Sequence, residues 1–110
     1  MSENVVELTD ATFQAEVLES ELPVMIDIWA PWCGPCRMVT PVIEELADEH
    51  AGVIKVGKLN VDENQAIAGK LGINAIPAIL FFNGGREETD KRLVGVQPKA
   101  VYQRVIEELI

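Results

Sequence analysis

Apolar residues recur along the chain with two different periods, and each change of period predicts a change between strand and helix. Short apolar or alternating stretches predict strands at Val5–Leu8, 24–30, 53–61 and 77–82, and a returning strand that ends at Gly95. Apolar residues three and four positions apart predict helices over 9–20, 34–50, 65–71 and 98–109. The predicted order is therefore βαβαβαββα, which is typical of an α/β domain.

The stretch 24–30 contains almost no polar residue, as expected for a central strand that is buried on both faces. The helix 34–50 and the strand 53–61 follow it, and such a unit places its two strands parallel with a right-handed crossover. Pro41 lies inside the helix and predicts a kink there. We expect the two long helices to face the sheet through apolar stripes, formed by Met38, Val42, Ile43 and Leu46 in the first and by Val101, Val105, Ile106 and Leu109 in the last.

Length, composition and charge limit the functions that the chain can have. A chain of 110 residues with 48% hydrophobic and 25% charged residues is expected to form one domain over residues 1–110. Its formal charge of −9 argues against nucleic acid or an anionic membrane as a partner. Residues 1–4 lack the basic start of a secretion signal, and no apolar stretch is long enough to span a bilayer. We expect a cytoplasmic protein that is a monomer.

The two cysteines of the chain, Cys33 and Cys36, stand between the central strand and the following helix, in the segment Trp-Ala-Pro-Trp-Cys-Gly-Pro-Cys that begins at Trp29. Thiols at positions i and i+3 lie on one face of a helical turn. They can be zinc ligands, an inert structural disulfide or a redox-active dithiol. Zinc normally needs four ligands, and the chain offers only His50 in addition, at the far end of the helix. A disulfide across so short a loop adds little stability, so the redox interpretation is favoured.

The residues around the cysteines predict different roles for the two thiols. A helix that starts near Cys33 would place this thiol at a helix N-terminus, where unpaired backbone N–H groups and the helix dipole stabilise a thiolate. Pro35 suits the first turn of a helix, and Trp32 gives the first sulfur an apolar border on which a partner can rest. Cys36, one turn further on, should be more buried and less acidic. We therefore expect Cys33 to attack a disulfide and Cys36 to resolve the intermediate.

The segment Ile-Asp-Ile-Trp-Ala-Pro-Trp-Cys-Gly-Pro-Cys-Arg-Met, which begins at Ile26, resembles the active-site segment of the thioredoxin family, and the similarity extends over nearly the whole chain. The resemblance implies a thioredoxin fold, with a central mixed five-stranded β-sheet flanked by four helices and Cys33-Gly34-Pro35-Cys36 at the carboxyl end of a strand. It implies a general protein disulfide reductase that acts on disulfide-containing target proteins, with no bound cofactor and no metal. Electrons would come from NADPH through a thioredoxin reductase, which is a flavoprotein.

Two charged residues in predicted strands are candidates for proton transfer. Asp27 interrupts the apolar strand 24–30; it either faces solvent at a sheet edge or is a buried acid with a raised pKa, suited to accept the proton of Cys36. The resemblance supports the buried acid, because the family has an aspartate behind the second cysteine. Lys58 alone would be assigned to the surface, but the resemblance matches it to the lysine that approaches this aspartate and tunes its pKa.

The resemblance also implies a binding surface for the target. It matches Ile76-Pro77 to a cis-proline bond packed beside the disulfide, where the backbone of Ile76 would pair with an extended partner peptide. Gly95 would border the same groove, together with Trp32 and Ile76. Trp29 is expected to pack under the active-site loop, so that Trp29 and Pro41 support the site structurally.

The chain departs from the family at Ile28, Gln65 and Ala78, where many members have Phe, Pro and Thr, and its hairpin 84–92 is about two residues longer. Two other functions compete with reduction of disulfides. A disulfide oxidase or isomerase usually carries His in the CxxC motif, in place of Gly34 or Pro35, and has a secretion signal. A binding module with an incidental dithiol would dock partners through Trp32, Ile76 and Gly95.

Overall fold

Strand β2 (Val24–Trp29) runs through the middle of the sheet in the computed structural model, which describes residues 2–110. Its parallel neighbour is β3 (Lys55–Asn60), and its antiparallel neighbour is β4 (Ala78–Asn83). Strand β1 (Val5–Leu8) pairs with the other side of β3. Because β2 has neighbours on both sides and helices over both faces, its first five residues are buried, which explains its apolar sequence.

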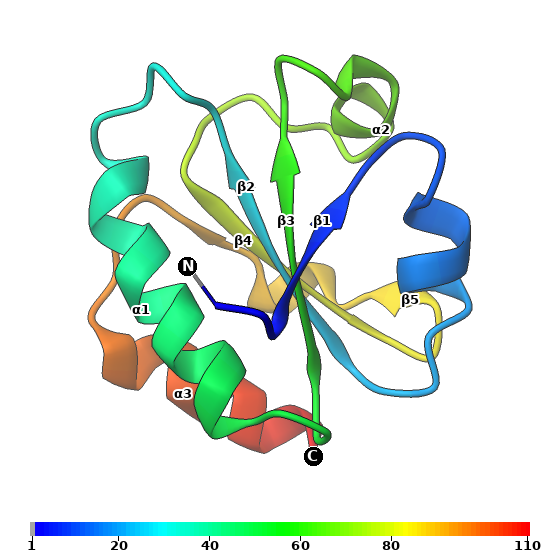
Figure 1. The fold of residues 1–110 in the computed structure, drawn as a ribbon, viewed down its shortest axis with the longest axis vertical. Helices are drawn as coiled ribbons and strands as arrows, with labels where there is room; N and C mark the ends of the chain where they lie inside the picture. Colours follow the sequence, from blue (N-terminus) through cyan, green and yellow to red (C-terminus); the bar gives the residue numbers. More distant parts are fainter. Residues whose placement is uncertain (1) are drawn as a thin grey trace.

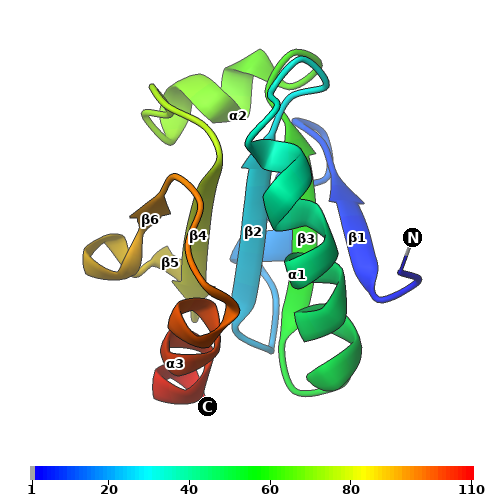
Figure 2. The same ribbon diagram turned by 90° about the vertical axis from the view of Figure 1, so that its left-hand side faces the viewer.

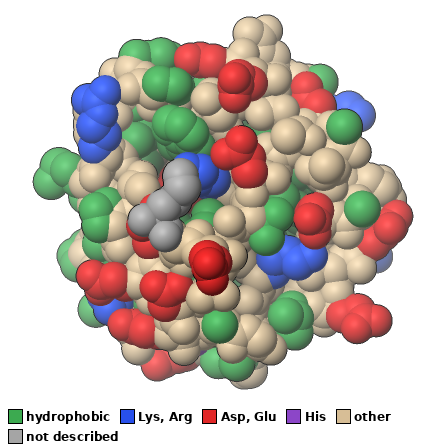
Figure 3. Space-filling model, viewed as in Figure 1, with side chains coloured by type: hydrophobic (Ala, Val, Ile, Leu, Met, Phe, Trp, Pro, Cys, Tyr) green, Lys and Arg blue, Asp and Glu red, His purple; other side chains and the backbone are tan. Residues whose placement is uncertain are grey.

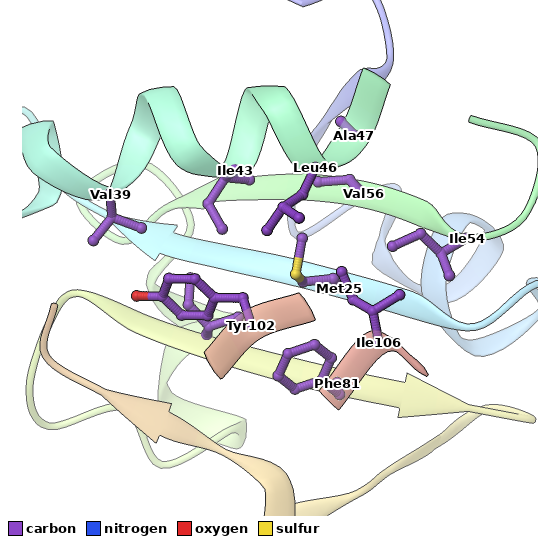
Figure 4. Close-up of a cluster of buried hydrophobic side chains, with 11 residues drawn as sticks. Met25, Val39, Ile43, Leu46, Ala47, Ile54, Val56, Phe81, Tyr102 and Ile106 are labelled. Atoms are coloured by element: carbon purple, nitrogen blue, oxygen red, sulfur yellow. The ribbon is translucent and has the colours of Figure 1, made fainter. Parts of the chain in front are cut away.

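The helices cover both faces of this mixed sheet (Figures 1 and 2). On one face lie α1 (Cys36–Glu49) and α3 (Lys99–Leu109), and on the other lie α2 (Gln65–Lys70) and a one-turn π-helix, η1 (Gln14–Leu18). Alternate side chains of each strand enter opposite cores. Figure 4 shows the core on the face covered by α1 and α3, in which Met25 lies below α1 and Phe81 lies near Tyr102 and Ile106 of α3.

The α/β class, the order βαβαβαββα and the parallel pairing around the first long helix are confirmed, but the returning strand is divided. Its two parts, β5 (Arg86–Glu87) and β6 (Leu93–Val94), both pair with β4, so the sheet has six strands instead of five. Between the paired positions, residues 88–92 face only Leu80 and Phe81 of β4. The extra residues therefore leave the sheet as a 3₁₀ turn, η2 (Thr89–Lys91).

Three expectations about the helices are corrected. The first helix is only the short η1, and α1 begins at Cys36 with Pro35 as its N-cap, later than predicted. Met38 is 67% exposed, because it lies about 100° around the helix from the buried Val39, which faces the sheet in its place. In α3 the predicted inward stripe is largely confirmed, because Ile106 is fully buried and Val105 and Leu109 pack against the core; Tyr102 is also fully buried, and Val101 is half-buried.

Within residues 2–110, none of the helices combines the length and the apolar character needed to cross a lipid bilayer.

Candidate active site

The two cysteines form a disulfide at the carboxyl end of β2, in the turn that leads into α1. Cys33 lies in a tight turn closed by its own N–H and the carbonyl oxygen of Ala30, 3.1 Å away. Pro35 has helical backbone angles and is the N-cap of α1. Proline has no backbone N–H, and at this position no helical hydrogen bond is lost as a result. The backbone N–H of Cys36 donates to Sγ of Cys33 at 3.2 Å. One of the free donors at this helix N-terminus therefore points at the first sulfur, as predicted.

The predicted difference in exposure between the two sulfurs is not present in the disulfide form. Cys33 is 4% exposed and Cys36 is 2% exposed, so both residues are buried. They form a small cluster with Ala30, against which Trp29, Val61 and Ile76 pack. The side chains of neighbouring loops therefore cover Cys33, although the adjacent Trp32 is 67% exposed and Gly34 is exposed.

Asp27 is a buried acid in the central strand, and the alternative of a solvent-facing edge residue is wrong. It is 2% exposed and pairs with Lys58 on one side and Ile79 on the other. Within the described chain, its Oδ1 atom has no hydrogen-bond partner. Burial raises the pKa of Asp27 from 3.8 to about 7, and the positive charge of Lys58 partly opposes this rise. The carboxyl group can therefore gain and lose a proton near neutral pH.

Lys58 lies beside this acid and beside the active-site loop. Its Nζ atom is 5.0 Å from the centre of the Trp29 ring, a cation–π contact that keeps the half-buried ammonium group against the loop. A cavity of about 120 Å³ is lined by Lys58, Trp29, Cys36 and four neighbours, Ala30, Pro31, Arg37 and Thr40. The cavity has room for ordered water, and Cys36 forms part of its wall, so water can reach this cysteine from the cavity.

A cleft of about 370 Å³ lies next to the disulfide, with Trp32 on one side and Ile76 on the other. The rest of its lining is mainly apolar and comes from the residue after β3, from α2 and from the loop that follows α2, namely Val61, Ala68, Ile73, Asn74 and Ala75. The bond between Ile76 and Pro77 is cis, as the resemblance implied. Gly95 does not line this cleft, but its N–H donates to the carbonyl oxygen of Pro77 at 2.8 Å, so it borders the same loop.

Asp62 is a residue of this site that the sequence analysis missed. Its carboxylate accepts the indole N–H of Trp32, with distances of 3.1 Å to Oδ1 and 3.0 Å to Oδ2. The hydrogen bond holds the large exposed ring at the rim of the cleft. A signal was present, because Asp62 follows β3 at the carboxyl end of a parallel strand, next to the end of β2 that carries the cysteines.

Two predicted residues lie away from the sulfur atoms. Pro41 is exposed in the second turn of α1, which continues through it to Glu49. His50 is at the other end of α1, where its ring nitrogen Nδ1 lies 3.0 Å from the carbonyl oxygen of Leu46. In the part of the chain that is described, no group of three or more His, Cys, Asp or Glu side chains is arranged to hold a metal ion.

Comparisons with known proteins agree with this geometry. Residues 4–108 match the family "Thioredoxin". The chain is 47% identical over 102 residues to thioredoxin 1 of Nostoc sp., which covers 93% of this chain and 94% of that protein. It is 48% identical over 104 residues to thioredoxin of Chlorobaculum thiosulfatiphilum, covering 94% of each. It is also 48% identical over 103 residues to the chloroplastic M-type thioredoxin of Pisum sativum, covering 94% of this chain and 59% of that protein.

Proposed function

Since the chain belongs to the thioredoxin family and is a protein disulfide oxidoreductase that works by dithiol–disulfide exchange, we propose that it is a general reductase of protein disulfides in which Cys33 attacks and Cys36 resolves. The observation that carries the proposal is the backbone N–H of Cys36 directed at Sγ of Cys33. After reduction, the same donor stabilises a negative charge on that sulfur. A thiolate held in this way is the nucleophile that disulfide exchange requires.

The reaction proceeds in two exchanges. The Cys33 thiolate attacks one sulfur of the target disulfide, a Cys33–target mixed disulfide forms, and the other target sulfur leaves as a thiolate that takes up a proton. Cys36 then gives its proton to Asp27, directly or through water in the neighbouring cavity, and attacks Sγ of Cys33. The second target thiolate leaves, and the Cys33–Cys36 disulfide remains. The target gains two electrons, and the protein loses two.

The cleft beside the disulfide serves as the docking site of the target. An extended segment of the target lies against Trp32 and pairs with the backbone of Ile76, in the manner of an added strand. This role is supported by the backbone of Ile76, which has no hydrogen-bond partner among residues 2–110. Pro77 and Gly95 shape the loop that presents Ile76. Lys58 tunes the pKa of Asp27, and Trp29 holds Lys58 in place.

We further propose that a thioredoxin reductase, drawing on NADPH, returns the oxidised pair to the dithiol. The partners are then disulfide-containing proteins and this flavoprotein, and the protein acts as a monomer in the cytoplasm. The formal charge of −9 supports the absence of nucleic acid and anionic membrane from this set.

The test is the reduction of insulin by dithiothreitol in the presence of the wild-type protein, Cys33→Ser and Cys36→Ser. We expect the wild-type protein to accelerate the reaction and both variants to lose this activity. Cys36→Ser is the matched control, because it keeps the attacking thiol and should accumulate a mixed disulfide with insulin, whereas Cys33→Ser should not. Equal rates for the wild-type protein and Cys33→Ser would refute the proposal.

A further inference from the structure

The loop of residues 72–77 connects α2 to β4 and carries the cis-proline bond, and one short segment of the chain holds both of its ends. At the start of the loop, Nη2 of Arg92 donates to the carbonyl oxygen of Leu71 at 2.9 Å. At the end of the loop, the N–H of Gly95 donates to the carbonyl oxygen of Pro77 at 2.8 Å. Figure 2 shows β6, which joins these two residues, beside the chain that descends from α2 into β4.

Between these two ends the loop has few backbone hydrogen bonds of its own. The N–H of Ile73 donates to the carbonyl oxygen of Ala68 at 3.0 Å. Among residues 2–110, the backbones of Asn74, Ala75 and Ile76 have no hydrogen-bond partner. The side chain of Ile76 packs against the cysteine cluster, but no hydrogen bond fixes the backbone of these three residues, which line the cleft. Their backbone conformation therefore depends on how firmly the ends of the loop are held.

Arg92 is well suited to hold one end. Its guanidinium group makes a two-pronged contact with Glu87, with Nε 2.8 Å from Oε2 and Nη2 2.7 Å from Oε1. The side chains are 24% and 11% exposed, so the pair is largely shielded from water. Such a fork fixes the direction of the guanidinium plane, which a single contact would not do. Leu71 follows the last residue of α2, where carbonyl groups lack helical partners and a positive charge is favourable.

We propose that Arg92, oriented by Glu87, is a positioning residue for target binding, which sets the loop 72–77 in the shape that the target backbone recognises. The inference rests on the proposed docking of the target at Ile76. It also gives a role to the residues between β5 and β6, because their turn η2 ends at Arg92 and places this residue in contact with Glu87. Without this contact the target must order the loop as it binds, so affinity falls while the exchange at the sulfur atoms is unchanged.

The test compares Arg92→Ala and Arg92→Lys with Lys91→Ala. Lys91 is the matched control, since its ion pair at 3.2 Å is with Glu108 of α3, away from the loop. The measurements are kcat and KM for insulin, and the rate with a small aromatic disulfide that reaches the sulfur atoms without occupying the cleft. For Arg92→Ala we expect KM for insulin to rise about three- to tenfold, with kcat and the small-disulfide rate unchanged. Arg92→Lys, which keeps a donor but loses the fork, should fall between, and Lys91→Ala should match the wild-type protein.

An unchanged KM for insulin in Arg92→Ala would overturn the inference. So would an equal loss with both substrates, since that pattern indicates general damage to the fold. If Arg92→Ala does not fold, Arg92→Lys and Glu87→Gln carry the same test. A wild-type protein that fails to reduce insulin would refute the proposed function instead. In that case NMR order parameters decide the inference alone: they should fall at Asn74, Ala75 and Ile76 in Arg92→Ala, and unchanged values would overturn it.

Discussion

At the scale of single residues, Asp27 shows what a carboxyl group experiences inside an apolar core. Its pKa rises from 3.8 to about 7 on folding because burial disfavours the charged form. The folded state therefore holds this proton more tightly than the unfolded chain does. The resulting contribution to stability is fully present below pH 4 and is lost as the pH rises through about 7. The group that is proposed to accept a proton thus destabilises the fold at the pH at which it works.

We expect Asp27→Asn to be more stable than the wild-type protein at pH 8 and equally stable near pH 3.5. The rise of this pKa from 3.8 to about 7 corresponds to a gain of up to about 4 kcal/mol at pH 8. Urea unfolding at several pH values measures it. Asp48→Asn is a control of opposite sign, because hydrogen bonds from Ser2 and Asn4 lower the pKa of Asp48, so its loss should destabilise the fold at pH 8 and not at low pH. An Asp27→Asn gain that does not vary with pH would contradict the assignment.

The same substitution should slow the release of the target. In the wild-type protein, the resolution of a preformed mixed disulfide should accelerate as the pH rises through about 7, because Asp27 then becomes able to accept the proton of Cys36. In Asp27→Asn this step in the pH profile should disappear and the rate at pH 7 should fall, while the initial attack by Cys33 is retained. Stopped-flow, single-turnover kinetics separate the two exchanges. Identical pH profiles would remove Asp27 from the mechanism.

The two thiols should differ in acidity although both sulfurs are buried in the disulfide form. Only the Cys33 sulfur receives the backbone N–H of Cys36, so we expect its thiol to have a pKa clearly below the ordinary value of about 8.5. At pH 7, iodoacetamide should therefore modify Cys33 much faster than Cys36 in the reduced protein. Mass spectrometry of peptides after short exposure measures the ratio. Equal modification of both cysteines would contradict the division of roles.

Site residues whose neighbours in the sequence indicate their position in the fold could be predicted. Residues whose role depends on a contact with a distant part of the chain could not. Cys33, Cys36 and Asp27 stand in one short segment whose order alone indicates strand, turn and helix. Asp62 and Arg92 depend on contacts with Trp32 and Leu71, which are 30 and 21 positions away in the sequence. The position of Asp62 after a parallel strand was a signal for the site, but neither this position nor the sequence around Arg92 shows which residue each side chain contacts.

At the scale of elements, the side chain of Leu8 in β1 lies directly over position 57 of β3, where glycine leaves room for it. A Cβ atom there would lie 2.6 Å from Cδ1 of Leu8, which is fully buried and cannot move aside freely. We expect Gly57→Ala to lower the free energy of unfolding by about 1–3 kcal/mol, and Leu8→Val in the same chain to recover part of the loss. Chemical unfolding of the single and double variants measures the coupling.

Gly69→Ala is the matched control for this substitution. Gly69 lies in α2, and a Cβ atom there would have no neighbour within 4 Å. Alanine is the better helix former, so the control should be neutral or stabilise the protein by up to about 1 kcal/mol. If the two alanine variants unfold at the same denaturant concentration, the close approach of Leu8 has no energetic consequence.

The elements themselves were predictable in type and order, but only some of their ends were. The apolar run of β2 and the glycines after α1 and α2 mark a central strand and two helix ends in the sequence alone. The π-helix η1 and the division of the returning strand depend on contacts between distant residues. The Nζ atom of Lys55 donates to the carbonyl oxygen of Glu16 at 2.9 Å, and Arg92 forms its ion pair with Glu87 across η2. Periodicity contains no information about such contacts.

At the scale of the whole molecule, charge determines which targets approach most easily. The chain has 18 acidic and 9 basic residues, and Figure 3 shows acidic side chains spread over the face seen in Figure 1. The field of a charge of −9 extends about one Debye length beyond the surface, which is about 30 Å at 0.01 M salt and about 3 Å at 1 M. A target therefore meets this field before it reaches the disulfide, and salt removes it.

We expect a disulfide peptide flanked by lysines to be reduced about two- to tenfold faster than the same peptide flanked by glutamates at about 0.01 M salt. The two rates should converge toward 1 M salt, because screening then confines each charge to its immediate surroundings. A peptide flanked by glutamines is the control and should show little change with salt. The comparison of kcat/KM across salt concentrations also separates two sources of preference: a long-range field disappears with salt, whereas direct contacts in the cleft between Trp32 and Ile76 persist. If the glutamate peptide is faster at low salt, nearby cations such as Arg37 and Lys58, which line the cavity beside Cys36, outweigh the total charge of the molecule.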